Sequence, residues 1–142
     1  MLKVLVPVDG SDNALRAVRH VASIESNCRE AGEICLLNVQ RPVASGVVRM
    51  FVSKGDLKGY YEEEGAKALA AAREALSKAG ASFKAEVRVG DMAETIARYA
   101  REQGCGLIAM GTRGLGSVAN LLLGSIATKV ISLAHVPVLL IK

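Results

Sequence analysis

The segment from Met110 to Ser125 contains the residues whose types and spacing indicate phosphate chemistry. Gly111, Gly114 and Gly124 stand in it, and Ser125 directly follows the last of them, in the spacing Gly-x2-Gly-x9-Gly-Ser. A glycine has no side chain, so its backbone N–H groups are exposed and an anion can approach the chain closely. The segment is therefore a candidate phosphate cradle.

The candidate cradle lies between an expected strand and an expected helix. The apolar run Leu107 to Ala109 precedes it, and Ile126, Val130 and Leu133 follow it at helical spacing. At a helix N-terminus, free N–H groups and the positive end of the helix dipole favour a phosphate. Ser125 either caps this helix or turns its hydroxyl toward a phosphate oxygen or a bound metal, and the sequence leaves both uses open.

The glycine spacing differs from the common nucleotide-binding motifs. It is not the dinucleotide fingerprint, and no lysine follows Gly124 as it does in the phosphate loop of the common nucleotide hydrolases. The alternative to a ligand site is a glycine-rich turn, because glycines are common where strands meet helices in doubly wound folds.

Asp9 is a second candidate, because it directly follows the apolar run Lys3 to Val8. In open α/β sheets, ligands bind at the carboxyl ends of the strands. Asp9 either accepts hydrogen bonds from a ligand there or bonds its own backbone as a turn residue. Ser11 is expected to cap the helix that follows.

Strands and helices alternate along the sequence. The five expected strands are Lys3 to Val8, Glu33 to Val39, Ser82 to Val89, Gly106 to Met110 and Val136 to Ile141. The four expected helices are Asp12 to about Cys28, Tyr60 to Ala79, the segment after the capping box of Asp91 that ends at Gly104, and Ser125 to Ala134. This alternation predicts a parallel sheet with right-handed crossovers and helices on both faces, and 142 residues fit one domain, residues 1–142.

Two segments differ from the rest of this pattern. Ser82 to Val89 alternates apolar with charged residues, which predicts an edge strand with one solvated face. Arg41 to Gly59 contains one proline and three glycines and has no sustained period, so it is expected to be a mobile loop. The apolar residues in this loop favour packing on the ligand side or on another subunit.

The chain resembles the ATP-binding branch of the universal stress protein family. The resemblance rests on the glycine spacing, on the final Val-Pro-Val-Leu strand, and on the opening Lys-Val-Leu-Val-Pro-Val-Asp-Gly-Ser. It extends over essentially the whole chain and implies a Rossmann-like, adenine nucleotide alpha hydrolase-like fold with a five-stranded parallel sheet in the order 3-2-1-4-5. In that order the first and fourth strands are neighbours, which predicts a crevice between Asp9 and Gly111.

The resemblance also implies that ATP binds at this crevice, with or without Mg²⁺, and that ADP and AMP are alternative ligands. It places adenosine against Pro7 to Asp9 and Val39, ribose and phosphates near Gly111 and Gly114, and the triphosphate tail on Gly124 and Ser125. Arg113 either reaches a phosphate or is solvated. The full set of expected nucleotide-binding residues is Pro7, Val8, Asp9, Val39, Met110, Gly111, Arg113, Gly114, Gly124, Ser125 and Ile126.

The expected function is nucleotide-dependent regulation in a stress response, acting on an unknown protein partner. The first alternative is a weak ATPase or phosphotransferase. Against it, the chain has no lysine after Gly124, no obvious metal-binding carboxylate besides Asp9, and no convincing base. The second alternative is an interaction module of the same fold that has lost its nucleotide, and the intact glycine spacing argues against it.

The amino-acid composition limits the other classes of protein to which the chain can belong. With 51% hydrophobic and 23% charged residues the chain is typical of a globular protein, and its apolar runs are too short to span a membrane. The 18 basic and 14 acidic residues are scattered, so no nucleic-acid surface is expected. No secretory leader is recognisable, which favours a cytoplasmic location. Cys28, Cys35 and Cys105 are expected to be reduced packing residues, with Cys28 the more accessible.

The last strand predicts a homodimer. Val136 to Ile141 is apolar on both faces, yet the order 3-2-1-4-5 places it at an edge of the sheet without the charges that protect the opposite edge. Pairing with its two-fold mate as an antiparallel ladder would satisfy its free backbone groups. The alternative is a monomer in which the segment Arg41 to Gly59 covers this edge.

Overall fold

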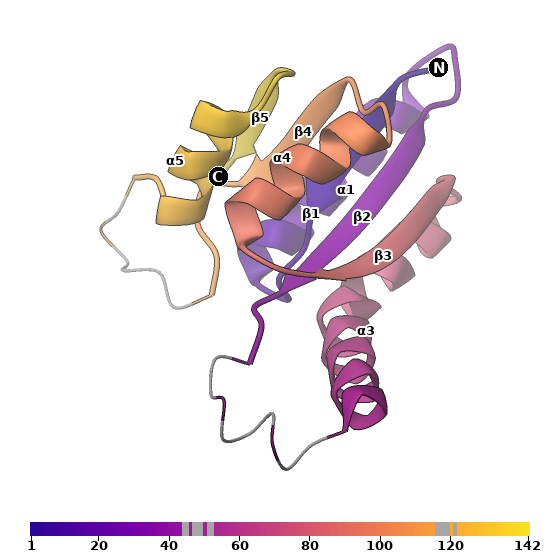
Figure 1. The fold of residues 1–142 in the computed structure, drawn as a ribbon. Coiled ribbons are helices and arrows are strands. Elements are labelled where there is room, and N and C mark those ends of the chain that lie inside the picture. The colour runs from indigo at the N-terminus through magenta and orange to yellow at the C-terminus, as the bar shows by residue number, and fades with distance from the viewer. Residues whose placement is uncertain (44–45, 47–49, 51–52, 116–119, 121) are drawn as a thin grey trace.

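The computed structural model describes residues 1–43, 46, 50, 53–115, 120 and 122–142. Its strands form one parallel sheet in the order β3-β2-β1-β4-β5, as expected (Figure 1). The strands are β1 (Lys3–Pro7), β2 (Glu33–Gln40), β3 (Phe83–Val89), β4 (Leu107–Gly111) and β5 (Val138–Ile141). Each boundary lies within two residues of the expected one.

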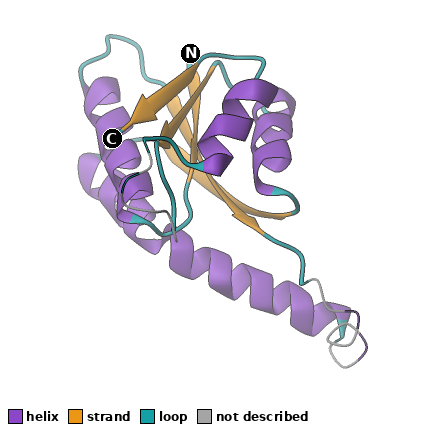
Figure 2. Cartoon of the chain, turned by 90° about the vertical axis from the view of Figure 1, so that its left-hand side faces the viewer, coloured by secondary structure: helices purple, strands orange, loops and turns teal. Residues whose placement is uncertain are grey.

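Helices cover both faces of the sheet, as Figure 2 shows. The helices α1 (Asp12–Ser26) and α3 (Lys54–Ala79) pack on one face, and α4 (Met92–Glu102) and α5 (Ser125–Leu133) pack on the other. Successive residues of a strand point to opposite faces, so Val4 and Val6 of β1 enter the first core while Leu5 enters the second. A strand that feeds two cores must be apolar throughout, which explains the continuous run at the start of the chain.

Side-chain caps fix the start of two helices where the sequence predicts them. The Oγ of Ser11 accepts a hydrogen bond from the N–H of Ala14 at 3.1 Å, and an Oδ1 of Asp91 accepts one from the N–H of Glu94 at 3.1 Å. Each cap satisfies an N–H group that has no partner inside its helix.

The helix α3 begins at Lys54, six residues before the expected start at Tyr60, so part of the expected loop is helical. The Oγ of Ser53 caps this helix by accepting from the N–H of Asp56 at 3.1 Å. Gly55 and Gly59 suggested a loop, but an isolated glycine costs a helix only about 1 kcal/mol. Of the rest of that expected loop, residues 44–45, 47–49 and 51–52 lie outside the described residues.

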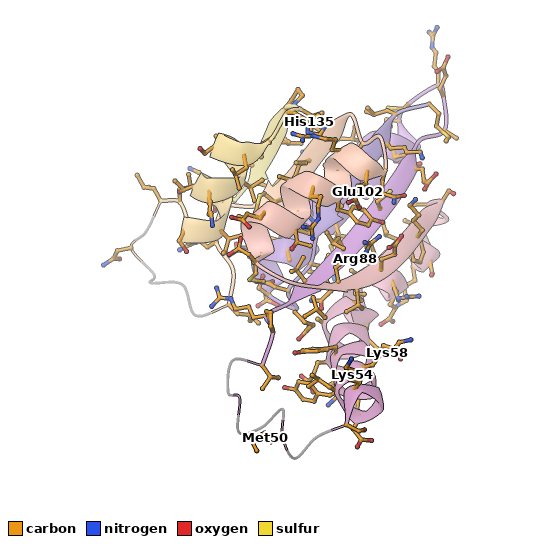
Figure 3. The ribbon with its side chains drawn as sticks, in the orientation of Figure 1. Met50, Lys54, Lys58, Arg88, Glu102 and His135 are labelled. Atoms are coloured by element: carbon orange, nitrogen blue, oxygen red, sulfur yellow. The ribbon has the colours of Figure 1, made fainter. Side chains whose placement is uncertain are left out.

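β3 is an edge strand, as expected, but its charged face is not fully solvated, because Lys84, Glu86 and Arg88 are half-buried. Ion pairs connect Lys84 and Arg88 to the neighbouring elements. Arg88 on β3 lies toward Glu102 on α4, with 3.9 Å between Nη1 and Oε2 (Figure 3). The Nζ of Lys84 lies 3.4 Å from an Oε1 of Glu33 on β2. In the described part of the chain, no helix has the length and apolar character needed to cross a membrane.

The three cysteines divide as the sequence predicts: Cys35 and Cys105 are buried and Cys28 is exposed. Burial raises the pKa of the Cys35 thiol to about 12 and also raises the pKa of Cys105. Because the thiolate is the reactive form, both buried thiols are unreactive near neutral pH. We expect iodoacetamide to modify only Cys28 in the folded protein and all three cysteines in urea, as measured by intact mass. Rapid labelling of Cys35 in the folded protein would contradict this assignment.

Candidate functional site

A cavity of about 430 Å³ lies at the carboxyl ends of β1, β2 and β4. Its size falls within the range of roughly 300–1,000 Å³ that is usual for small-molecule sites. All eleven residues of the predicted nucleotide site line it: Pro7, Val8, Asp9, Val39, Met110, Gly111, Arg113, Gly114, Gly124, Ser125 and Ile126. The fold therefore gathers around one cavity the residues that the sequence analysis selected.

The position of the cavity follows from the strand order. β1 pairs with β2 on one side and with β4 on the other, so the chain leaves the sheet in opposite directions at this point. The N–H of Val8 donates to the carbonyl of Leu37 at 2.8 Å, which holds the chain after β1 against β2. A crevice opens at such a switch point because the two crossovers diverge.

One half of the cavity is apolar. Val39 from β2 and Met110 from β4 are buried at its wall, and Ile96 from α4 and Ile126 from α5 line it from the helical side. These side chains come from elements on the same face of the sheet, because Val39 and Met110 belong to the core that α4 and α5 cover. A flat, weakly polar group such as a nucleobase fits chemistry of this kind.

The N-terminus of α5 forms another part of the cavity wall. Gly124 is the N-cap of this helix, and as a glycine it has no side chain that could make a capping hydrogen bond. Ser125, Ile126 and Ala127 occupy the first turn and line the cavity. The first N–H groups of a helix have no acceptor inside it, so this end of the cavity favours an anion.

The structure resolves part of the open question about Ser125. Because Gly124 takes the N-cap position, Ser125 is the first helical residue and does not cap the helix. Ser125 is exposed and lines the cavity. A bond from its hydroxyl to a ligand stays a prediction.

Asp9 bonds its own backbone as a turn residue, which is one of the two roles predicted for it. Its Oδ1 accepts from the N–H of Ser11 at 2.9 Å. Its Oδ2 accepts from the N–H of Leu115 at 3.0 Å, across a sequence separation of 106 residues. The second bond joins the end of β1 to the glycine-rich segment, and nothing in the sequence indicated it. A bond from Asp9 to a ligand stays a prediction.

Two of the three motif glycines are explained by close approaches within the protein. A side chain at Gly111 would place its Cβ 3.0 Å from backbone atoms of Asn13 in α1. A side chain at Gly114 would overlap the carboxylate of Asp9. At Gly124 the backbone φ of −72° and ψ of 161° are open to any residue. Its backbone conformation therefore does not require glycine.

Sequence reasoning missed several residues that line the cavity, among them Asn38 and Thr112. Asn38 is buried, and its Nδ2 donates to the carbonyl of Val8 at 2.8 Å. Thr112 is buried as well; its N–H donates to Ile141 at 3.0 Å and its carbonyl accepts from Gly124 at 2.6 Å. A polar residue near the end of an otherwise apolar strand was the available signal for Asn38.

Comparison with known proteins gives one consistent family. The profile of the universal stress protein family matches residues 1–142. A universal stress protein of Thermus aquaticus is 34% identical over 140 residues, covering 98% of this chain and 97% of the relative. Universal stress protein MJ0577 of Methanocaldococcus jannaschii is 30% identical over 154 residues, covering 99% of this chain and 94% of the relative.

Solved structures agree with this result. A structure of MJ0577 has a TM-score of 0.82 to this chain, with 99% of this chain and 94% of the other covered. A universal stress protein solved in complex with cAMP is 25% identical, with a TM-score of 0.72 and coverage of 99% and 97%. The sequence motif, the strand order and these comparisons agree, and the chain belongs to the universal stress protein family.

Proposed function

We propose that this protein binds ATP in the cavity and acts as a nucleotide-dependent regulator in a stress response. The observation that carries the proposal is the cavity itself, in which an apolar half leads to a helix N-terminus without a capping side chain. An adenine nucleotide has the matching shape, with a flat base at one end and phosphates at the other. The relative solved with cAMP supports an adenine nucleotide as the ligand class.

The chemistry of the walls sets the expected orientation of the nucleotide. The base would lie in the apolar half beside Val39 and Met110, and the phosphates would lie at Gly124 and Ser125. Pro7, Val8 and Asp9 would line the sugar, with Gly111, Gly114 and Ile126 around the path to the phosphates. Arg113 is half-buried in the cavity wall and would add positive charge beside them.

Mg²⁺ would accompany ATP through its phosphates rather than through a protein cage. Among the residues that the structure describes, no three His, Cys, Asp or Glu side chains gather as a metal site. Mg²⁺ commonly binds in this way, with few protein ligands and several waters. Because the phosphates would lie at the N-terminus of α5, we expect ADP and AMP to occupy the same cavity. The affinity should increase with each phosphate that reaches α5.

Titration calorimetry with ATP, ADP and AMP tests the proposal, together with the identity of any nucleotide released when the purified protein is denatured. ATP at about 100 times its Kd should stabilise the fold by roughly 2.7 kcal/mol, which raises Tm by several degrees. The absence of both heat of binding and thermal stabilisation at millimolar nucleotide would overturn the proposal. It would favour the nucleotide-free interaction module instead.

A dedicated ATPase is not proposed. The one carboxylate at the cavity that sequence analysis selected, Asp9, already accepts a backbone N–H on each oxygen. Phosphoryl transfer needs a residue that orients the attacking nucleophile, whereas the two bonds of Asp9 give it a role in holding the backbone. A turnover assay with a Ser125→Ala control tests for slow hydrolysis.

We also propose a homodimer built on β5. This strand is last in the sheet of the described residues, and all four of its residues are apolar and half-buried. Ile131 and Leu133 of α5, the helix that precedes this strand in the chain, are 44% and 39% exposed. A second copy paired along this edge would cover the strand.

A further inference from the structure

The carboxylate of Asp9 holds two segments of backbone at once. Its Oδ1 accepts from Ser11 at 2.9 Å within the turn that begins α1, and its Oδ2 accepts from Leu115 at 3.0 Å in the segment that follows β4. Gly114 lies against the same carboxylate so closely that it has no room for a Cβ. We call the Asp9 carboxylate, Gly114 and the Leu115 N–H the Asp9 clasp.

The Asp9 side of the clasp is anchored independently of any ligand. The bond from Ser11 fixes the orientation of the carboxylate, and Gly10 has a φ of +87° that permits the tight turn. Behind it, the buried amide of Asn38 donates to the carbonyl of Val8 at 2.8 Å. The carboxylate therefore projects from a turn that hydrogen bonds hold on two sides.

Apolar burial does not hold the Leu115 side of the clasp. The Leu115 side chain is 69% exposed, so the residue gains little from packing. Its backbone N–H is instead bonded to a charged acceptor, which is stronger than a bond between neutral groups. The bond to Asp9 thus contributes to the position of this backbone.

We infer that Asp9 is a positioning residue that holds the start of the glycine-rich segment at the cavity before a nucleotide arrives. The effect on nucleotide affinity rests on the proposed function: a segment held in place beforehand has less conformational freedom to lose on binding. Gly114 is a glycine in the motif because it must pass over this carboxylate. Asp9 thus acts on the nucleotide through Gly114 and Leu115, whatever direct contact it makes.

Amide hydrogen exchange of the nucleotide-free protein tests the clasp directly. Asp9→Ala should speed exchange at the Leu115 N–H by about tenfold or more, because one bond to a charged acceptor is lost. Asp12→Ala, which removes an exposed acid three residues away, is the matched control and should leave Leu115 unchanged. Unchanged exchange at Leu115 in folded Asp9→Ala protein would overturn the inference.

A double-mutant cycle gives a second readout. Gly114→Ala should lower Tm in the wild-type background, because the added methyl group overlaps the Asp9 carboxylate. In an Asp9→Ala background the methyl group has room, so the same change should lower Tm by less than half as much. Equal losses of Tm in both backgrounds would show that Gly114 and Asp9 are not coupled and would contradict the clasp.

Nucleotide titration then separates this inference from the proposed function. Asp9→Ala should weaken ATP binding by about tenfold, which corresponds to the loss of one charged hydrogen bond. Absence of ATP binding in the wild type would defeat the proposed function and leave the exchange result standing. Normal ATP binding with unchanged Leu115 exchange in Asp9→Ala would defeat the clasp alone.

Discussion

Gly124→Val is expected to weaken ATP binding by at least about 100-fold, or roughly 2.7 kcal/mol, while the protein stays folded. Gly124 is buried at the cavity wall and is the N-cap of α5. A valine side chain there would take up space that the phosphates need and would keep them from the first N–H groups of the helix. The loss of ATP affinity combines steric exclusion of the phosphates with the loss of their interaction with the N-terminus of α5.

The fold should tolerate this substitution because the backbone at Gly124 is ordinary. Its φ of −72° and ψ of 161° lie in the extended region that valine prefers. Valine is a poor N-cap, so we expect a cost of about 1 kcal/mol or less relative to glycine. Circular dichroism should then show an intact fold beside a binding isotherm that is lost or strongly weakened.

Gly59→Val is the matched control. Gly59 lies in α3 and does not line the cavity, and among the described residues no atom beyond its chain neighbours and the backbone of its own helix lies within 4 Å of the position that a Cβ would take. The same glycine-to-valine change at this site should leave ATP affinity within about twofold of wild type. Equal affinity of Gly124→Val and wild type would remove the phosphate assignment from α5, whatever the control shows.

The helices and strands could be predicted from the sequence because each local signal agreed with the others, while the strand order came from the family resemblance. Apolar runs gave the buried strands, helical spacing gave the amphipathic helices, and Ser11 and Asp91 gave two helix starts that the structure confirms. The predicted start of α3 was wrong because glycines such as Gly55 and Gly59 occur in loops more often than in helices. Their small cost was overridden by the Ser53 cap and by the packing of the rest of this long helix.

The candidate site was predictable as a set of residues but not as a set of contacts. The spacing of Gly111 and Gly114 marks places where the backbone must come close to something. Only the fold shows that the neighbours are Asn13 and the Asp9 carboxylate. Long-range bonds such as the one from Leu115 to Asp9 leave no local pattern, because each partner alone is an unremarkable loop residue.

Leu140→Pro is expected to convert the proposed homodimer to a monomer. The carbonyls of Pro137 and Ile141 accept from Ile108 and Thr112 at 3.0 Å each, so these positions of the last strand face β4. In a parallel ladder the backbone groups of alternate residues face opposite sides. The backbone of Leu139 therefore also faces β4, and that of Leu140 faces the free edge of the sheet.

This alternation makes Leu139→Pro the comparison variant, because the two substitutions remove a donor from opposite sides of the strand. Each also removes one half-buried leucine side chain, Leu139 from the core under α1 and α3 and Leu140 from the core under α4 and α5. Leu139→Pro removes an N–H from the β4 ladder and should lower the stability of the subunit itself. Leu140→Pro removes an N–H only from the free edge, where an edge strand tolerates proline. Its effect should appear in the mass in solution, beside the stability cost of removing the half-buried Leu140 side chain from the core that α4 and α5 cover.

Two-fold symmetry doubles the effect at Leu140, because each copy in the dimer loses the same donor. At about 1 kcal/mol or more for each lost hydrogen bond, the dimer Kd should increase by roughly 30-fold to 100-fold. Sedimentation of the protein at roughly tens of micromolar measures this change in the dimer Kd. A wild-type protein that is already monomeric there would exclude the dimer, and a Leu140→Pro protein that keeps the dimer mass would place the interface elsewhere.

The alternative cover for this edge, the segment Arg41 to Gly59, is disfavoured because its helical part belongs to α3, which packs near β3 at the far side of the sheet (Figure 1).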